Sequence, residues 1–216
     1  MLRAIICLCF VTIAVGQVIR VGPCVWENRT SGINFNFTGM LGEWHQIRRI
    51  PNPEETGQCS TLNLEVNATI PLPVVKITHK EVHDKHLHTR VGQIVPKNMS
   101  LEVFSIIYDN LTYDSVVALT DYAKYAVLYS CMPIPSSNNS AVVAWVYGRN
   151  TSLSQIDATI VQAFISGDED LRNASWVETS HTKDACSTSG SVISQLSPIV
   201  GFFCLMIFGR KTLISC

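Results

Sequence analysis

The chain has 216 residues, of which 47% are hydrophobic, enough for one domain of ordinary size with a core of its own. Its formal net charge is −1, and it carries no basic patch interleaved with aromatic residues, which excludes nucleic acid as a partner. No Ser/His/Asp set is recognisable, so we expect neither an enzyme nor a cofactor.

The N-terminus has the pattern of a secretory signal peptide spanning residues 1–16. Arg3 supplies the positive start, Ala4 to Ile13 the apolar run, and Ala14-Val-Gly16 the small-residue cleavage site. The alternative is a buried N-terminal strand or helix. Cleavage after Gly16 leaves residues 17–186 as the expected folded domain.

Asn-x-Ser/Thr triplets recur along the whole chain, and this frequency indicates a glycosylated surface and passage through the secretory pathway. The eight acceptor residues are Asn28, Asn36, Asn67, Asn98, Asn110, Asn138, Asn150 and Asn173.

Four cysteines, Cys24, Cys59, Cys131 and Cys186, lie within the expected domain. An even set in an oxidising compartment predicts two disulfides, and the spacing alone allows three pairings. No C-x-x-C pair occurs, so a structural zinc site is not expected. The other four cysteines lie in the terminal segments.

From Gly39 to Arg149, short apolar or alternating runs are separated by turn-forming residues, and no helical pattern comes between them. This arrangement favours a barrel or a sandwich. The clearest runs are Leu62–Val66, Val74–Thr78, Leu101–Ile107, Val116–Leu119, Tyr125–Tyr129 and Ala141–Tyr147.

One helix is expected after these strands. Thr151-Ser152 can cap it and Gly167 is placed to end it. The apolar residues at helical spacing are Ile156, Ile160, Ala163 and Phe164.

Three short motifs occur in a fixed order: Gly42-Glu-Trp44, then Thr120-Asp121-Tyr122, then Arg149 shortly before the helix. This set resembles the three-part fingerprint of the lipocalins. The resemblance implies an all-β fold, an eight-stranded antiparallel up-and-down barrel with one C-terminal helix packed outside, that forms a cup for small apolar molecules.

The resemblance also implies a structural role for each fingerprint residue. Trp44 would form the floor of the closed end, and Gly42 would let the backbone approach it closely. Arg149 would lie over the Trp44 ring in a cation–π contact. The Thr120-Asp121-Tyr122 turn would join two strands at the same end, with Asp121 capping backbone N–H groups.

Within the family, the chain is most similar to the apolipoprotein D and Lazarillo branch, from about Pro23 to Cys186. The matching segments include Gly42–Pro51, Gly57–Cys59 and Tyr125–Cys131. This resemblance implies the disulfide pairs Cys24–Cys131 and Cys59–Cys186. Residues 71–115 match poorly, so the identity of the ligand does not transfer.

Barrel alternation selects candidate ligand contacts. If Trp145 faces the interior with Arg149, then Val143 and Tyr147 do as well. Phe104, Ile106 and Val117 are further candidates from pattern alone, and the alternative is that all six fill a solid core. Gln46 and Arg48 share the parity of Trp44, which favours an amphiphilic ligand such as a fatty acid or a tetrapyrrole carboxylate. A β-bulge would reverse that inference.

Four histidines, His79, His83, His86 and His88, fall within ten residues, and imidazoles at such spacing can bind zinc or copper. The interleaved lysines, Asp84 and Arg90 instead favour a solvated hairpin, and we predict no metal.

The C-terminus, residues 187–216, fits a GPI-attachment signal. Ser187 is the expected attachment residue, residues 190–197 form a polar spacer, and residues 198–208 form an apolar run too short to span a bilayer. A single spanning helix starting near Val192 and a secreted form remain alternatives.

The expected protein is therefore a lipocalin on the outer cell surface that binds a fatty acid, retinoid, sterol or bilin and is held to the membrane by a lipid anchor. One alternative is a soluble secreted carrier of such ligands. Another is a glycosylated adhesion or guidance protein whose pocket is incidental.

Overall fold

The computed structural model describes residues 18–26, 35–66, 74–97, 102–109 and 111–189. The expected signal peptide and the chain beyond residue 189 lie outside these ranges. So do four of the glycosylation acceptors, Asn28, Asn67, Asn98 and Asn110.

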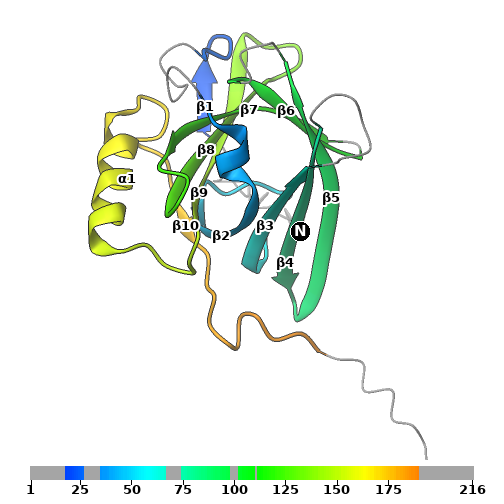
Figure 1. Ribbon diagram of the computed structural model, residues 1–216. Coiled ribbons are helices and arrows are strands. Elements are labelled where there is room, and N and C mark those ends of the chain that lie inside the picture. Colours follow the sequence, from blue (N-terminus) through cyan, green and yellow to red (C-terminus); the bar gives the residue numbers. More distant parts are fainter. Residues whose placement is uncertain (1–17, 27–34, 67–73, 98–101, 110, 190–216) are drawn as a thin grey trace, which may run out of the picture.

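Eight antiparallel strands, each paired with the next, close into a barrel because the last also pairs with the first (Figure 1). They are β2 (Gly42–Arg49), β3 (Gln58–Val66), β4 (Val75–His83), β5 (His86–Pro96), β6 (Phe104–Tyr108), β7 (Leu111–Thr120), β8 (Tyr125–Pro133) and β9 (Asn139–Gly148). Two short strands extend the sheet, β1 (Val18–Val21) on β9 and β10 (Val177–Glu178) on β2. The predicted fold class is confirmed.

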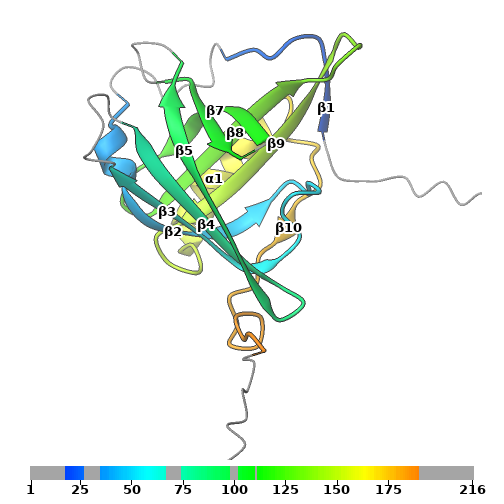
Figure 2. The same cartoon turned by 90° about the vertical axis from the view of Figure 1, so that its right-hand side faces the viewer.

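The barrel has one hydrophobic core inside and a second between its outer wall and the helix. Strands β8 and β9 contribute to both, so almost every residue in them is buried. This double burial explains their unbroken apolar runs, since a strand covered on both faces does not alternate. Figure 2 shows α1 lying behind these strands.

Helix α1 spans Gln155–Gly167 and is capped by Ser154, whose hydroxyl accepts from the N–H of Asp157. The predicted cap at Thr151-Ser152 was therefore wrong by two residues. Its buried residues are Asp157, Val161 and Ile165, spaced four apart, so that they form one face.

The predicted apolar face of α1 was partly wrong. Ile156 is 74% exposed and Ile160 42% exposed, while Phe164 packs against the outer core. Within the described ranges, no helix has the length and apolar character needed to cross a membrane.

Strand β5 was not predicted as a strand, because its first residues are mostly polar and exposed. It forms a hairpin with β4 through a two-residue turn, in which Asp84 and Lys85 both have positive φ, the geometry that matches the twist of paired strands. The expected solvated hairpin is present at its tip, but His79 is buried inside the barrel.

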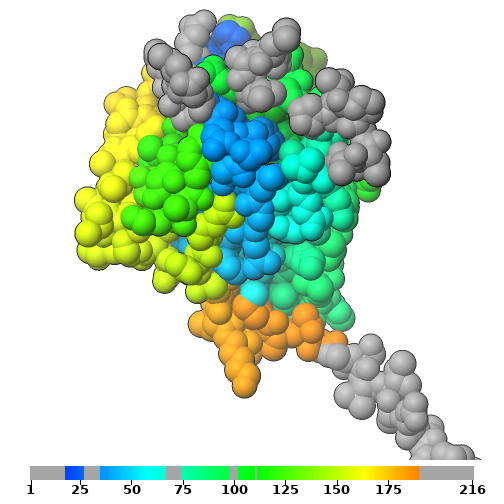
Figure 3. Space-filling view, viewed as in Figure 1, coloured from blue at the N-terminus to red at the C-terminus, as the bar shows by residue number. Residues whose placement is uncertain are grey.

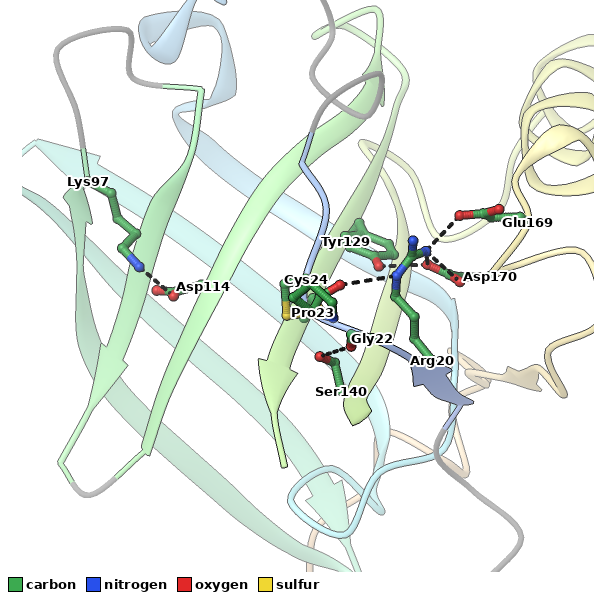
Figure 4. Close-up of a disulfide and its surroundings, with 11 residues drawn as sticks. Arg20, Gly22, Pro23, Cys24, Lys97, Asp114, Tyr129, Ser140, Glu169 and Asp170 are labelled. Carbon is green, nitrogen blue, oxygen red and sulfur yellow. Dashed lines mark hydrogen bonds and ion pairs between the residues drawn. A yellow bond between two sulfur atoms is a disulfide. The ribbon is translucent and has the colours of Figure 1, made fainter. Parts of the chain in front are cut away.

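Two disulfides tie the chain ends to the barrel: Cys24 is bonded to Cys131 on β8, and Cys59 on β3 to Cys186. These are the pairs that the family resemblance implies. Near the first, Arg20 on β1 forms ion pairs with Glu169 and Asp170 after α1 (Figure 4). The N-terminal strand is thus attached both to the barrel and to the segment that follows the helix.

Candidate functional site

One end of the barrel is closed by Trp44 and Arg149. The Trp44 ring is 1% exposed, and its indole N–H donates to the carbonyl of Met40 at 2.8 Å. The Arg149 guanidinium carbon lies 3.7 Å from the ring centroid, a cation–π distance. Gly42 has a φ of +91°, with Arg149 beside it. The guanidinium also donates to the carbonyls of Gly39 (2.9 Å), Glu43 (2.9 Å) and Tyr122 (3.1 Å).

The turn between β7 and β8 lies at the same end. The Thr120 hydroxyl donates to the carbonyl of Tyr125 and accepts from the N–H of Tyr122, both at 2.8 Å. One carboxylate oxygen of Asp121 accepts from the backbone N–H groups of residues 123–125. The fingerprint residues therefore contact one another at the closed end, and they do not extend into the rest of the barrel interior.

Above this floor is an apolar cavity of about 30 Å³, space for one or two water molecules. Four of the six candidate ligand contacts line it: Phe104, Ile106, Val117 and Tyr147. Val143 and Trp145 belong to the same interior core without lining the cavity. The remaining lining residues are Phe35, Phe37, Met40, Trp44, Leu62, Leu64, Ile77, Ile94, Ala126 and Leu128.

A β-bulge at Ile47 changes which polar residues of β2 face inward. Pairing with β9 shifts between Gln46 and Arg48, so that Arg49, opposite Trp145, faces the interior. Arg48 lies outside, where it donates to Gln162 on α1 and stacks on Trp176. Arg48 therefore does not face inward with Trp44, so the condition under which it favoured an amphiphilic ligand is not met. The basic group inside is Arg49, which is 3% exposed.

The segment of residues 50–57, which joins β2 to β3, places Glu55 inside the barrel, 7% exposed. Its Oε2 accepts from the Trp145 indole N–H at 2.6 Å and from the Gln46 amide at 3.0 Å. The Glu55 carbonyl accepts from Arg49 Nε at 2.9 Å. A polar cluster (Gln46, Arg49, Glu55 and Trp145) therefore lies in the half of the barrel away from the floor.

Burial changes the pKa values of neighbouring groups. Desolvation raises the pKa of the Tyr147 hydroxyl well above its ordinary value, and the negative charge of Glu55 adds to this. Desolvation lowers the pKa of His79, against the opposing effect of Glu55. The His79 ring shares a 2.8 Å hydrogen bond with Ser60. Both groups are therefore neutral at physiological pH.

A cleft of about 260 Å³ opens at the end of the barrel opposite the Trp44 floor, between residues 50–57 and strands β5 to β7. Arg90 crosses it, donating to the carbonyl of Glu54 at 2.6 Å and stacking over Tyr108 at 5.5 Å. This end is the mouth of the barrel, and Arg90 ties the mouth segment (residues 50–57) to the barrel wall.

Sequence reasoning missed Glu55 and Arg49. Glu55 lies in Asn52-Pro-Glu-Glu-Thr-Gly57, whose composition is typical of an exposed turn. Arg49 does not share the parity of Trp44, so strict alternation gives no reason to expect it inside. No pattern in one sequence marks a turn residue that folds back into a barrel.

Four glycosylation acceptors are described, and Asn36, Asn138, Asn150 and Asn173 are all exposed. The His83 and His88 rings lie 6.1 Å apart. Among the described residues, the one group with metal-ligand spacing is Cys59, His181 and Cys186, and both of its cysteines are committed to a disulfide.

Comparison with known proteins matches residues 41–178 to the Lipocalin / cytosolic fatty-acid binding protein family. Apolipoprotein D of Macaca fascicularis is 30% identical over 146 residues, covering 65% of this chain and 73% of that protein. The Lazarillo protein of Schistocerca americana is 22% identical over 133 residues, covering 60% and 62%. The structure of insecticyanin from Manduca sexta superimposes with a TM-score of 0.68 at 19% identity, covering 81% and 94%.

Proposed function

Because this chain belongs to the lipocalin family, a family of carriers rather than enzymes, we propose that it binds a small hydrophobic or amphiphilic ligand inside its barrel. We further propose that a GPI anchor displays it on the outer cell surface. The observation that carries the first proposal is the apolar cavity above the Trp44 floor. Every lining residue except Tyr147 ends in an apolar group, so water gains little there and an apolar ligand gains contact area.

The cavity is much smaller than the several hundred Å³ of a typical ligand pocket. A ligand must therefore displace side chains, and two features make this possible. Phe35 and Phe37 line the cavity while only half-buried. On the side of β4 and β5, the mouth segment is joined to the wall by a few contacts, made by Arg90, Glu81 and His83. Ligand entry at the mouth is proposed to expand the cavity toward the polar cluster.

Fluorescence titration tests the proposal. Retinol, oleic acid, cholesterol and biliverdin would be titrated separately into the mature glycoprotein. Saturable quenching of tryptophan emission by at least one of them is expected, because Trp44 borders the cavity and Trp145 belongs to the same interior core. A Trp145→Phe variant should retain binding with reduced amplitude. No saturable quenching by any of the four would favour the adhesion alternative, which the small size of the cavity also supports.

The anchor proposal rests on the end of the described chain. Ser187 is exposed one residue after the disulfide-bonded Cys186, and the small residues, spacer and apolar run of a GPI signal follow it in the sequence. Attachment at Ser187 would leave the folded domain and both of its disulfides intact.

A further inference from the structure

The carboxylate of Glu55 has an unused oxygen inside the barrel. Both of its side-chain hydrogen bonds, from Trp145 and Gln46, end on Oε2. Among the described residues, Oε1 accepts from no side chain and no backbone group. This oxygen keeps some contact with water, so a ligand donor that reached it would replace a water hydrogen bond in a largely desolvated site. The mouth-side end of the interior therefore presents a strong acceptor that lacks a donor.

The neighbouring guanidinium has only one N–H donor left for a second carboxylate. Four of the five N–H donors of Arg49 already point at protein acceptors. These acceptors are the Glu55 carbonyl (2.9 Å), the Gln46 amide oxygen (2.9 Å), the Thr179 hydroxyl (3.3 Å) and the Gly57 carbonyl (3.2 Å). Arg90, at the mouth, is engaged with Glu54. Glu81 adds another buried carboxylate, accepting from the N–H of Gly57.

The polar cluster is continuous with the cavity through Tyr147. The Tyr147 ring lines the cavity. Tyr147 lies opposite Gln46 in the β2–β9 pairing, and Gln46 donates to Glu55. A ligand with its apolar body on the Trp44 floor would thus bring its far end to the Glu55 carboxylate. Charge at that position acts through a medium of low dielectric, so attraction and repulsion are both stronger there than in water.

Resting on the proposed function, we infer that this barrel selects apolar ligands ending in a hydroxyl or another neutral hydrogen-bond donor, and that Glu55 discriminates against ligands ending in a carboxylate. A hydroxyl donates to Oε1 and satisfies it. A carboxylate brings a further negative charge and no donor to a place where Glu55 and Glu81 already outnumber Arg49, and this repulsion is a basis for rejection. This reverses the preference for acids that an inward-facing Arg48 implied.

The test uses two ligand pairs that differ only at the polar end: retinol with retinoic acid, and oleyl alcohol with oleic acid. Dissociation constants are measured by titration and by competition on the mature glycoprotein at pH 7.5. In each pair the alcohol is expected to bind roughly 10- to 100-fold more tightly, the range that one hydrogen bond to a charged group provides. Equal binding within a pair, or tighter binding of the acid, would overturn the inference and leave the proposed function intact.

Glu55→Gln identifies the residue responsible. The amide keeps an acceptor for Trp145 and Gln46, and it offers an N–H to a ligand oxygen. Acid binding should therefore strengthen by about 10-fold or more, while alcohol binding changes by less than about threefold. Glu43→Gln removes a charge from an exposed side chain at the closed end and should leave both constants unchanged. An alcohol preference that persists in Glu55→Gln would show that Glu55 does not set it. No saturable binding of any of the four ligands to the wild type would overturn the proposed function and the preference together.

Discussion

At the residue scale, the closed end depends on the Arg149 guanidinium, which donates hydrogen bonds to three segments. Arg149 connects the end of β9 to η1 (Phe37–Met40), to the first residues of β2 and to the β7–β8 turn, by donating to one carbonyl in each. The same group covers the face of Trp44. Burial lowers the pKa of Arg149, yet its ordinary value is so high that it remains charged.

Replacing Arg149 should therefore open the floor of the barrel. Arg149→Met keeps most of the aliphatic contact with Trp44 but leaves the three carbonyls without their donor. We expect a loss of about 2–3 kcal/mol in the free energy of unfolding, the cost of unsatisfied polar groups. Urea denaturation followed by tryptophan fluorescence measures it. Arg172→Met, at an exposed position after α1, is the matched control and should stay within about 0.5 kcal/mol of the wild type. Equal stability of the two variants would contradict a structural role for Arg149.

The buried imidazole of His79 predicts a pH dependence of stability. Desolvation lowers its pKa in the folded state, with Glu55 and Glu81 opposing and Arg90 and Arg49 reinforcing the shift. The unfolded chain then binds a proton near pH 6.5 that the folded chain does not. Stability from neutral His79 is thus present above pH 6.5 and lost as the pH falls toward the lowered pKa. His45, whose pKa burial also lowers, acts in the same direction.

Thermal unfolding at pH 7.5 and pH 5.0 checks this. The wild type should be less stable at pH 5.0, and His79→Gln, which can keep the hydrogen bond to Ser60, should show a smaller difference. His86→Gln removes an exposed histidine of the same hairpin and should leave the wild-type difference unchanged. If His79→Gln retained the full difference, the pH dependence would have another origin.

At the element scale, the mouth segment, which connects β2 to β3, is held in place from two sides. It is fixed inside by Glu55 and outside by Arg90, which bonds the Glu54 carbonyl and covers Tyr108. The contacts of Glu55 are buried, whereas the Arg90 side chain is 28% exposed. The contact between Arg90 and Glu54 is therefore the weaker of the two. Ligand entry should begin by breaking it.

Arg90→Ala is accordingly expected to speed ligand uptake. The association rate constant, measured by stopped-flow quenching with retinol, should rise by about threefold to tenfold, because the variant opens the mouth more often. The dissociation rate should rise by a similar factor, so that affinity changes little. Lys80→Ala, at an exposed position on the neighbouring strand, is the control. A lower affinity with no change in association rate would show that Arg90 contacts the ligand instead of gating it.

The elements also show where sequence reasoning stops. Strands that are covered on both faces, such as β8 and β9, can be predicted from the sequence because nearly every residue in them favours a buried strand. Strand β5 cannot be predicted in this way, since its residues next to the β4–β5 turn are mostly polar and exposed. The bulge at Ile47 cannot be predicted from the sequence, because the extra residue is determined by the pairing of β2 with β9 and not by local conformational preference. That single residue exchanges Arg48 for Arg49 in the interior and so changes the expected ligand.

At the scale of the whole molecule, the fingerprint residues were enough to predict the barrel but not the polar side chains inside it. Trp44, Thr120 and Arg149 lie close together at one end, and their spacing in the sequence matches the topology. The interior polar cluster instead combines β2, β9, the mouth segment and Thr179 near β10. These segments meet only once the barrel has closed and the Cys59–Cys186 disulfide has returned the C-terminal segment to β3. Only a folded structure could have identified Glu55.

The C-terminal segment also fixes where an anchor would act. Lys85, in the β4–β5 turn, donates to the Asp184 carbonyl at 2.9 Å and to the Ser187 hydroxyl at 3.0 Å. The N–H of Ser189 donates to the Lys85 carbonyl at 2.8 Å. Figure 3 shows this segment lying below the barrel against the end of β4 and β5. Because the β4–β5 turn belongs to the mouth end, a lipid attached at Ser187 would hold the mouth on the membrane side.

Treatment of expressing cells with phosphatidylinositol-specific phospholipase C tests the anchor. Release of the glycoprotein into the medium is expected, because the enzyme cuts the lipid from a GPI anchor and leaves Ser187 with its glycan. Mass spectrometry of the released C-terminal peptide should then find that glycan on Ser187. A variant with Arg inserted after Phe203 interrupts the apolar run that the attachment machinery reads and should abolish surface display, whereas Arg172→Met should not. Retention on treated cells, with an Arg210-Lys211 epitope inside, would instead indicate a spanning helix. Glycoprotein in the medium of untreated cells, with none at the surface, would indicate a soluble carrier whose mouth no membrane faces.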